Sequence, residues 1–264
     1  MSETPSPKQE VEERAEKMEE SRMGLLEHLA ELRRRVVFSI IAIFIAFGIC
    51  WFFVHDLFEF LKAPLVAAAP DEQLYMADLH YSDVAEEFFT LLKTALLAAV
   101  FLAAPAILYQ IWKFVAPGLY PNEKKAVVPF IFAGTLFFFA GAAFCYAIVI
   151  PLGYGFLFDF STVSDPMLMI DEYFGTTTKL LLAFGIVFEL PVATYFLSAI
   201  GLVTHRMLIK QWRIAVVVAF VLAAILTPPD VMTQALLAGP MILLYLLSVG
   251  VAFIQTRRRE KKLS

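Results

Sequence analysis

Two glutamates in polar segments, Glu31 and Glu123, have the chemistry to bind a cationic ligand. Glu31 lies in a predicted amphipathic helix, residues 23–35, where an ion pair with Arg35 would also explain it as an ordinary surface acid. Glu123 is the one acid of the Pro-containing segment 112–125 and, alone, is equally well explained as a solvated side chain. Together they would suit a peptide with adjacent arginines, because each guanidinium binds a carboxylate through two parallel hydrogen bonds.

A third acid, Glu189, stands inside an apolar run, residues 176–200, with Pro191 two positions later. A carboxylate at the centre of a membrane helix costs about 2.5–3.5 kcal/mol on insertion scales, so hydrophobic selection alone would not place it there. Pro191 has no N–H, so it frees the carbonyl of Val187 and predicts a kink. An acid beside a kink indicates a polar cavity within a membrane protein.

The elements that must carry these residues are membrane helices. The chain has 264 residues, of which 60% are hydrophobic, and a mean hydropathy of +0.73; soluble chains are about 45–50% apolar. The apolar residues fall into blocks of membrane-spanning length between charged or Pro-containing stretches. We therefore predict an all-α membrane protein with six transmembrane helices, at about 34–54, 88–111, 126–150, 176–200, 213–227 and 232–253.

The basic residues predict how these helices are oriented. All but three of the 21 lysines and arginines lie on the side that holds both termini, and the positive-inside rule makes that side cytoplasmic. The other three are Lys62, Lys93 and Lys179. Residues 1–22 are acidic and predicted to be a disordered cytoplasmic tail, with no cleavable signal peptide. Residues 23–253 form the predicted transmembrane domain, and residues 254–264 a basic cytoplasmic tail.

The predicted fifth span, residues 213–227, is short. At 1.5 Å per residue it reaches roughly 22 Å, below the ~30 Å hydrocarbon core. A turn with Thr227 and Asp230, followed one helical turn later by Gln234, joins it to the sixth span. Asp230 could serve simply as a helix N-cap. Alternatively, Thr227, Asp230 and Gln234 form a docking site for a neighbouring membrane helix, since polar side chains hydrogen-bond across helices in lipid.

The sequence offers little for an enzyme. It has no HExxH, GxSxG or phosphate-loop motif. Cys50 and Cys145 both lie inside apolar runs and are expected to be small buried hydrophobes. No metal-ligand spacing is present. We therefore expect no covalent catalysis, metal, cofactor or nucleic-acid partner.

Several short segments, taken in order, resemble the TatC family, the core receptor subunit of the twin-arginine protein translocase. They are 28–35 (HLAELRRR), 62–65 (KAPL), 104–112 (APAILYQIW), 114–120 (FVAPGLY), 123–125 (EKK), 188–191 (FELP) and 226–231 (LTPPDV). The resemblance runs from about residue 23 to 252, with six spans in the family's order. It implies a concave, glove-shaped six-helix bundle in the bacterial cytoplasmic membrane.

The resemblance also implies roles for particular residues. Glu31 and Glu123 would contact the twin-arginine motif of signal peptides on the cytoplasmic side. The other matching positions are Arg33 and Phe114 at the same surface, Pro64 in the first outer loop, and Glu189. Single-span TatA- and TatB-type proteins would pack near spans five and six, and the chain would form a homo-oligomer within the receptor complex. Energy for export would come from the proton-motive force.

The main alternative is a secondary transporter or channel with Glu189 as its proton or cation site. A transporter would move a small solute when reconstituted alone, whereas a receptor needs a twin-arginine peptide. An intramembrane enzyme is a weaker alternative, because the spans lack a nucleophile–base pair.

Overall fold

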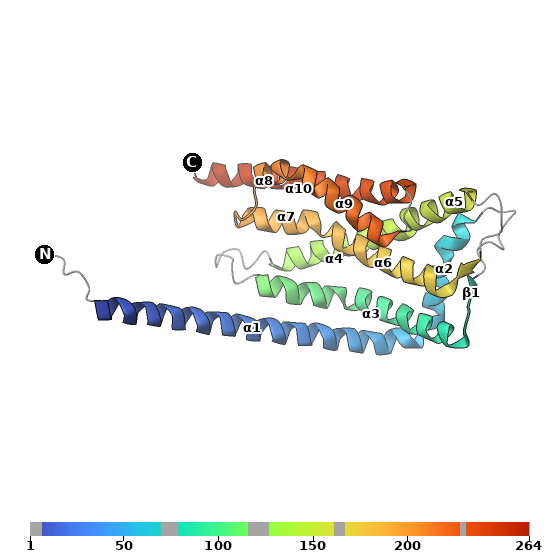
Figure 1. Cartoon of the computed structure of the whole chain (residues 1–264), viewed down its shortest axis with the longest axis horizontal. Coiled ribbons are helices and arrows are strands. Elements are labelled where there is room, and N and C mark those ends of the chain that lie inside the picture. Colours follow the sequence, from blue (N-terminus) through green and yellow to red (C-terminus); the bar gives the residue numbers. More distant parts are fainter. Residues whose placement is uncertain (1–6, 70–78, 116–126, 161–166, 228–230, 264) are drawn as a thin grey trace.

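Long helices lie side by side along one axis of the molecule, and α1 begins at the same end at which α10 finishes (Figure 1). The structure, a computed structural model, describes residues 7–69, 79–115, 127–160, 167–227 and 231–263. The helices are α1 (Pro7–Phe52), α2 (Val54–Ala68), α3 (Val84–Val115), α4 (Val127–Phe144), α5 (Ile150–Phe160), α6 (Ile170–Phe188), α7 (Leu190–Ala199), α8 (His205–Lys210), α9 (Trp212–Leu226) and α10 (Val231–Leu263). A π-helix, Cys145–Val149, joins α4 to α5, and two short strands, β1 (Leu79–His80) and β2 (Leu168–Met169), pair in parallel.

The predicted six-helix membrane fold is confirmed. Five stretches are long and apolar enough to cross a membrane: His28–Phe52, Ala85–Phe114, Pro129–Asp159, Ile170–Ala199 and Val231–Arg257. The predicted fifth span corresponds to α9, which has 15 residues and is the shorter apolar helix. The third span is longer than the predicted 126–150, because the helix continues through the π-helix and past Pro151 into α5. The π-helix ends two residues before Pro151, which has no backbone N–H to donate.

Both predicted tails continue helices. α1 begins at Pro7, so residues 7–22, predicted to be disordered, are helical in the structure. Glu, Lys, Arg, Ala and Met favour helices, and extending an existing helix avoids the cost of nucleation. At the other end of the chain α10 runs to Leu263, through most of the predicted basic tail.

The first outer segment contains a helix that the sequence analysis did not predict. α2 crosses the ends of the long helices, at the end of the molecule opposite the start of α1 (Figure 1). Pro64, predicted to lie in a loop, is buried inside α2. The residues that α2 buries are Val54, Leu61, Pro64 and Leu65. Their helical spacing is the signal that identifies this segment as an amphipathic helix.

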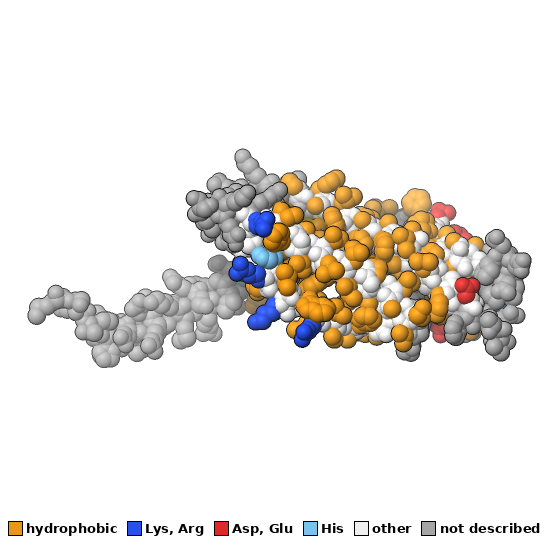
Figure 2. All heavy atoms as spheres, turned by 90° about the horizontal axis from the view of Figure 1, so that it is seen from above, with side chains coloured by type: hydrophobic (Ala, Val, Ile, Leu, Met, Phe, Trp, Pro, Cys, Tyr) orange, Lys and Arg blue, Asp and Glu red, His pale blue; other side chains and the backbone are white. Residues whose placement is uncertain are grey.

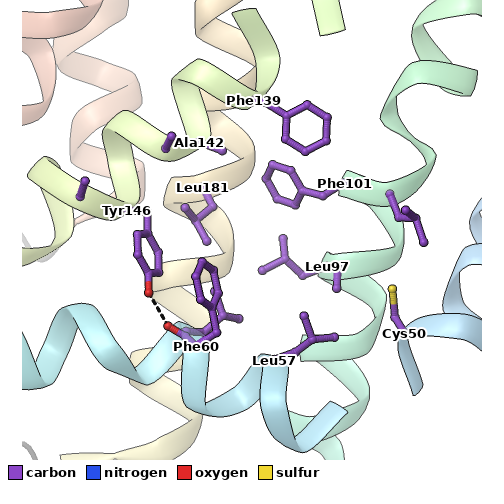
Figure 3. A pocket seen from close by; sticks show the side chains of 14 residues that line it. Cys50, Leu57, Phe60, Leu97, Phe101, Phe139, Ala142, Tyr146 and Leu181 are labelled. Carbon is purple, nitrogen blue, oxygen red and sulfur yellow. Dashed lines mark hydrogen bonds between the residues drawn. The ribbon is translucent and has the colours of Figure 1, made fainter. Parts of the chain in front are cut away.

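Two tyrosines fasten α2 to the rest of the bundle. Pro64 has no N–H, so the carbonyl of Phe60, four residues earlier, loses its helical donor. The Tyr146 hydroxyl donates to that oxygen at 2.6 Å, and the two rings stack with centroids 4.5 Å apart (Figure 3). Tyr146 belongs to the π-helix, whose extra residue per turn changes the direction of its side chains. One residue on, the Leu61 carbonyl accepts from the Tyr173 hydroxyl of α6 at 2.6 Å.

Glycines allow α4 and α6 to pack closely. A Cβ on Gly141 of α4 would lie 2.5 Å from the Phe184 carbonyl oxygen and 2.7 Å from a ring carbon of Phe188. A Cβ on Gly185 of α6 would lie 2.7 Å from the ring of Phe138. Small residues at such contacts let helix backbones approach in lipid, where packing replaces the hydrophobic effect between helices. The position of α6 against α4 therefore depends on both glycines.

Polar contacts hold the outer ends of α3 and α6 together. The Glu86 carboxylate accepts from the Ser82 N–H at 2.8 Å and from the Ser82 hydroxyl at 2.7 Å, which caps the start of α3. Its other oxygen accepts from the Asp171 N–H at the start of α6, at 3.2 Å. Lys93 of α3 pairs with the Asp171 side chain. These contacts lie beside the β1–β2 pair and close this end of the bundle.

We predict that Tyr146→Phe lowers the thermal stability of the protein in detergent. The Phe60 carbonyl would be left without a donor, because Pro64 supplies none, and losing one hydrogen bond costs about 0.5–1.5 kcal/mol. Tyr154→Phe is the matched control, because its ring packs against Phe158 and Tyr173 and its hydroxyl makes no hydrogen bond to a described residue. Pro64→Ala restores a backbone donor to Phe60, so Tyr146→Phe should cost less in that background. An equal cost in both backgrounds would contradict this account of Pro64.

Candidate functional site

The cytoplasmic ends of α1 and α3 meet through an aromatic contact. The rings of His28 and Phe114 stack with centroids 4.5 Å apart and planes 22° from parallel. Glu31 follows His28 by three residues, so it lies on the same face of α1. Lys113 precedes Phe114 and lies over the ring of Tyr109, 5.4 Å from its centroid. The structure therefore brings Glu31 and Phe114, which the sequence predicts to share a site, to one surface.

Glu31 is paired within its own helix. Nη2 of Arg35, one turn further along α1, donates to Oε1 of Glu31, as the spacing of four residues predicts. The Glu31 side chain is 37% exposed and the Arg35 side chain only 13%. Nε of Arg35 is buried and has no hydrogen-bond partner among the described residues. Glu31 is thus accessible to a ligand from the cytoplasmic side.

Two predicted partners of Glu31 are placed differently. Arg33 is exposed, but two residues along a helix turn through about 200°, so it projects from the opposite side of α1. Its neighbour Arg34 lies over the ring of Phe38, 5.6 Å from the centroid. Glu123 lies outside the described residues. Of the predicted peptide-binding residues, the structure therefore brings together Glu31 and Phe114.

Charged side chains separate to the two ends of the molecule. Figure 2 shows lysine and arginine side chains at one end, aspartate and glutamate side chains at the other, and a hydrophobic surface between them. The basic end is the end of Glu31, and the acidic end is that of α2. This separation is the pattern that the positive-inside rule predicts for a protein with its basic end in the cytoplasm.

The fourth span is broken at Glu189, as Pro191 predicts. α6 ends at Phe188 and α7 begins at Leu190, with Pro191 in its first turn. The Glu189 carbonyl accepts from the Ala193 N–H at 2.8 Å and starts the hydrogen bonding of α7. The span begins earlier than predicted, at Ile170, so Glu189 lies in its cytoplasmic half rather than at its centre.

Glu189 lies in an apolar groove between α3, α4, α6 and α7. The groove has a volume of about 530 Å³, and its lining includes Trp112, Phe138, Ile186 and Phe196. The prediction of a polar cavity is therefore wrong, since Glu189 is the one charged residue among those that line the groove. Oε1 of Glu189 has no hydrogen-bond partner among the described residues. The helix break leaves space for the carboxylate, but the neighbouring helices supply apolar walls.

A glycine determines where the Glu189 carboxylate rests. A Cβ on Gly134 of α4 would lie 3.1 Å and 3.3 Å from the two carboxylate oxygens and 3.5 Å from Nε1 of Trp112. The carboxylate therefore packs directly on the α4 backbone, close to the edge of the indole. Any larger residue at position 134 would require it to move.

The residues predicted to dock a partner helix are hydrogen-bonded within the chain. The Thr227 hydroxyl donates to the Ala223 carbonyl at 2.9 Å, at the end of α9. The Gln234 amide of α10 donates to the Phe220 carbonyl of α9, also at 2.9 Å. The Gln234 hydrogen bond links α10 to α9, whereas the Thr227 hydrogen bond stays within the end of α9. Asp230 lies outside the described residues.

A second apolar groove lies between α1, α2, α3 and α4, and Figure 3 shows it from close by. Its volume is about 580 Å³. Cys50, Leu57, Phe101 and Phe139 point toward it, and the Tyr146–Phe60 hydrogen bond lies at its edge (Figure 3).

Comparison with known proteins decides the family. The family model described as Sec-independent protein translocase protein (TatC) matches residues 27–240. The chain belongs to the TatC family. A TatC protein of Campylobacter jejuni is 42% identical over 84% of this chain and 90% of its own length, and one of Aquifex aeolicus is 39% identical over 90% and 98%. A crystal structure of the twin-arginine translocase receptor TatC matches with a TM-score of 0.79 and 39% identity, covering 87% of this chain and 99% of that one.

Membership of the TatC family confirms several predictions together. The chain is a multi-pass protein of the bacterial cytoplasmic membrane, with a glove-shaped six-helix fold and both termini in the cytoplasm. It is a component of a protein translocase. A secondary transporter or channel that uses Glu189 is not favoured by these findings.

The sequence analysis missed several residues that position the candidate sites. His28 stands three residues before Glu31, and that spacing could have indicated a shared face. Gly134 and Tyr146 gave no such signal, because their roles depend on contacts with Glu189 and Phe60 on other helices. Trp112 lies beside Glu189 although the two are far apart in sequence.

We predict that Gly134→Val lowers the free energy of unfolding by about 1–3 kcal/mol, the usual cost of overpacking a well-packed contact. Gly48→Val is the matched control, because a Cβ on Gly48 meets nothing within 4 Å. Replacing Glu189 by Ala first removes the oxygens that the new side chain would meet. Gly134→Val should then cost less, and an unchanged cost would contradict the contact between Gly134 and the carboxylate.

Proposed function

We propose that this chain is the signal-peptide receptor and core component of a twin-arginine translocase, which exports folded proteins across the cytoplasmic membrane. The observation that carries the proposal is the surface where α1 meets α3. It presents the accessible carboxylate of Glu31 beside the stacked rings of His28 and Phe114, at the basic end of a TatC-family chain. A related crystal structure is described as the twin-arginine translocase receptor.

Recognition of the peptide would rest on two carboxylates. Glu31 lies near the end of α3, and Glu123 belongs to the segment that joins α3 to α4 on the same side of the membrane. One guanidinium of a twin-arginine motif would bind each carboxylate through paired hydrogen bonds. Phe114 would contribute apolar contact beside Glu31, and Arg33 would act from the other side of α1. The proposed site binds a peptide and carries out no covalent chemistry.

Partner proteins would bind the α9–α10 hairpin. α9 has 15 residues, or roughly 22 Å, so it leaves part of the bilayer thickness uncovered. Exposed apolar side chains cover its outer face, among them Ile214, Val217, Val221 and Ile225. Single-span TatA- and TatB-type helices could cover this face, and near Thr227 and Gln234 they would have to compete with the internal hydrogen bonds. A homo-oligomer of this chain within the receptor complex, and export driven by the proton-motive force, complete the proposal.

Glu189 is proposed to serve the membrane-embedded step rather than peptide recognition. Its carboxylate lies in the cytoplasmic half of the bilayer, in a groove that opens between helices, with one oxygen unpartnered among the described residues. Such a group can accept a hydrogen bond from a polar residue of a partner helix or draw water into the membrane.

We predict that Glu31→Ala and Glu123→Ala each weaken binding of a twin-arginine peptide about two- to fivefold, as expected for accessible charge pairs. The double variant should bind much more weakly than either single variant, and Glu→Lys changes should be more severe than changes to Ala. Crosslinking of a labelled peptide measures this. Glu172→Ala, an exposed acid of α6 at the outer end, is the control and should bind normally. Undiminished crosslinking in the double variant would refute the assignment.

We also predict that a partner helix docks beside Gln234. In a chain with Cys50 and Cys145 replaced by Ala, a cysteine at Val231 should form disulfides with cysteines in a TatA- or TatB-type helix. Val231 is 78% exposed at the start of α10. Phe44→Cys on α1, at a residue that is 71% exposed, is the matched control. Disulfides at position 44 and none at 231 would place the docking site elsewhere.

A further inference from the structure

The carboxylate assigned to a ligand's arginine is already engaged by an arginine of the protein. Arg35 donates to Glu31 from one turn along α1. Its side chain is only 13% exposed, so it is held against the protein, while Glu31 remains accessible. An incoming peptide therefore meets a carboxylate whose charge is already compensated.

We propose that Arg35 sets the affinity of this site: it occupies Glu31 in the free protein, and a peptide guanidinium must exchange with it. The proposal rests on the proposed function, because it takes the ligand of Glu31 to be a twin-arginine peptide. Arg35 does not itself contact the peptide in this scheme. A ligand binds only if its interaction with Glu31 is stronger than the interaction between Arg35 and Glu31.

The geometry of the internal pair shows how a peptide arginine can replace Arg35. One nitrogen of Arg35, Nη2, engages one oxygen of Glu31, Oε1. A peptide guanidinium that approaches in the plane of the carboxylate can make two parallel hydrogen bonds and engage both oxygens. A lysine ammonium is a point charge without this fork, so it has no geometric advantage over Arg35. Displacing Arg35 costs the same free energy for either ligand, so the preference for arginine over lysine would come from the guanidinium fork at Glu31 and not from Arg35.

The other positive groups around Glu31 also weaken its binding of a ligand cation. Arg35 remains positively charged after exchange and repels the bound cation. Lys113 and His28 also lie within electrostatic reach of Glu31. Nε of Arg35 is buried without a partner among the described residues, so Arg35 has few alternative contacts when Glu31 leaves it. Removing Arg35 should accordingly strengthen binding of any cationic peptide, and by the same factor for an arginine and a lysine peptide.

The test compares two peptides on the purified full-length protein in detergent: a twin-arginine signal peptide and the same peptide with two lysines. Arg35→Gln should strengthen binding of both peptides by the same factor, up to about fivefold. Arg34→Gln is the matched control, because it removes the same charge from the next residue, where the guanidinium lies over Phe38. It should change both affinities equally and by less than about twofold.

Several outcomes would overturn the proposal. Weaker binding in Arg35→Gln would mean that Arg35 positions Glu31 for the ligand, and equal effects of Arg34→Gln and Arg35→Gln would mean a general charge effect. In a Glu31→Gln background, Arg35→Gln should change neither affinity; an undiminished gain there would also refute exchange. Arg35→Ala provides the test if Arg35→Gln does not fold, and unchanged affinity for both peptides in that variant would refute the proposal. If Glu31→Gln alone binds normally, the proposed function itself fails at this site.

Discussion

The central constraint on this protein is that hydrocarbon offers no water to hydrogen-bond the backbone. Each proline in a membrane helix therefore creates a problem that a neighbouring group must solve. At Pro64 the solution is the Tyr146 hydroxyl, which a π-helix directs toward the Phe60 carbonyl. At Pro191 the chain instead ends one helix and begins another, with Glu189 between them. The bends and contacts that shape the bundle follow from these two solutions.

Close packing between helices then determines where the Glu189 carboxylate lies. Gly141 and Gly185 bring α4 and α6 into direct contact, and Gly134 then lies against the carboxylate at the end of α6. The same helices provide the apolar walls of the groove around Glu189. An expensive acid is therefore held at a defined depth by small residues on a neighbouring helix.

The proposed peptide-binding residues lie at the cytoplasmic end of the bundle, where the apolar helices leave the membrane. At the outer end α2 crosses the bundle, and the contacts of Glu86 and Lys93 with Asp171 join α3 to α6. The cytoplasmic end presents Glu31 beside an aromatic contact that links α1 to α3. A receptor of the twin-arginine type needs this division, because peptide recognition occurs in water while the rest of the chain stays in lipid.

The sequence by itself determined the class of fold, the number and order of spans, the orientation and the family, because these depend on hydropathy, on the distribution of charge and on short motifs within single segments. It also located the break at Pro191, a property of the covalent backbone. Only the tertiary structure decided that Pro64 is buried and that the groove around Glu189 is apolar. The groove and the burial of Pro64 depend on which helices become neighbours, because a side chain's surroundings come from residues distant in sequence.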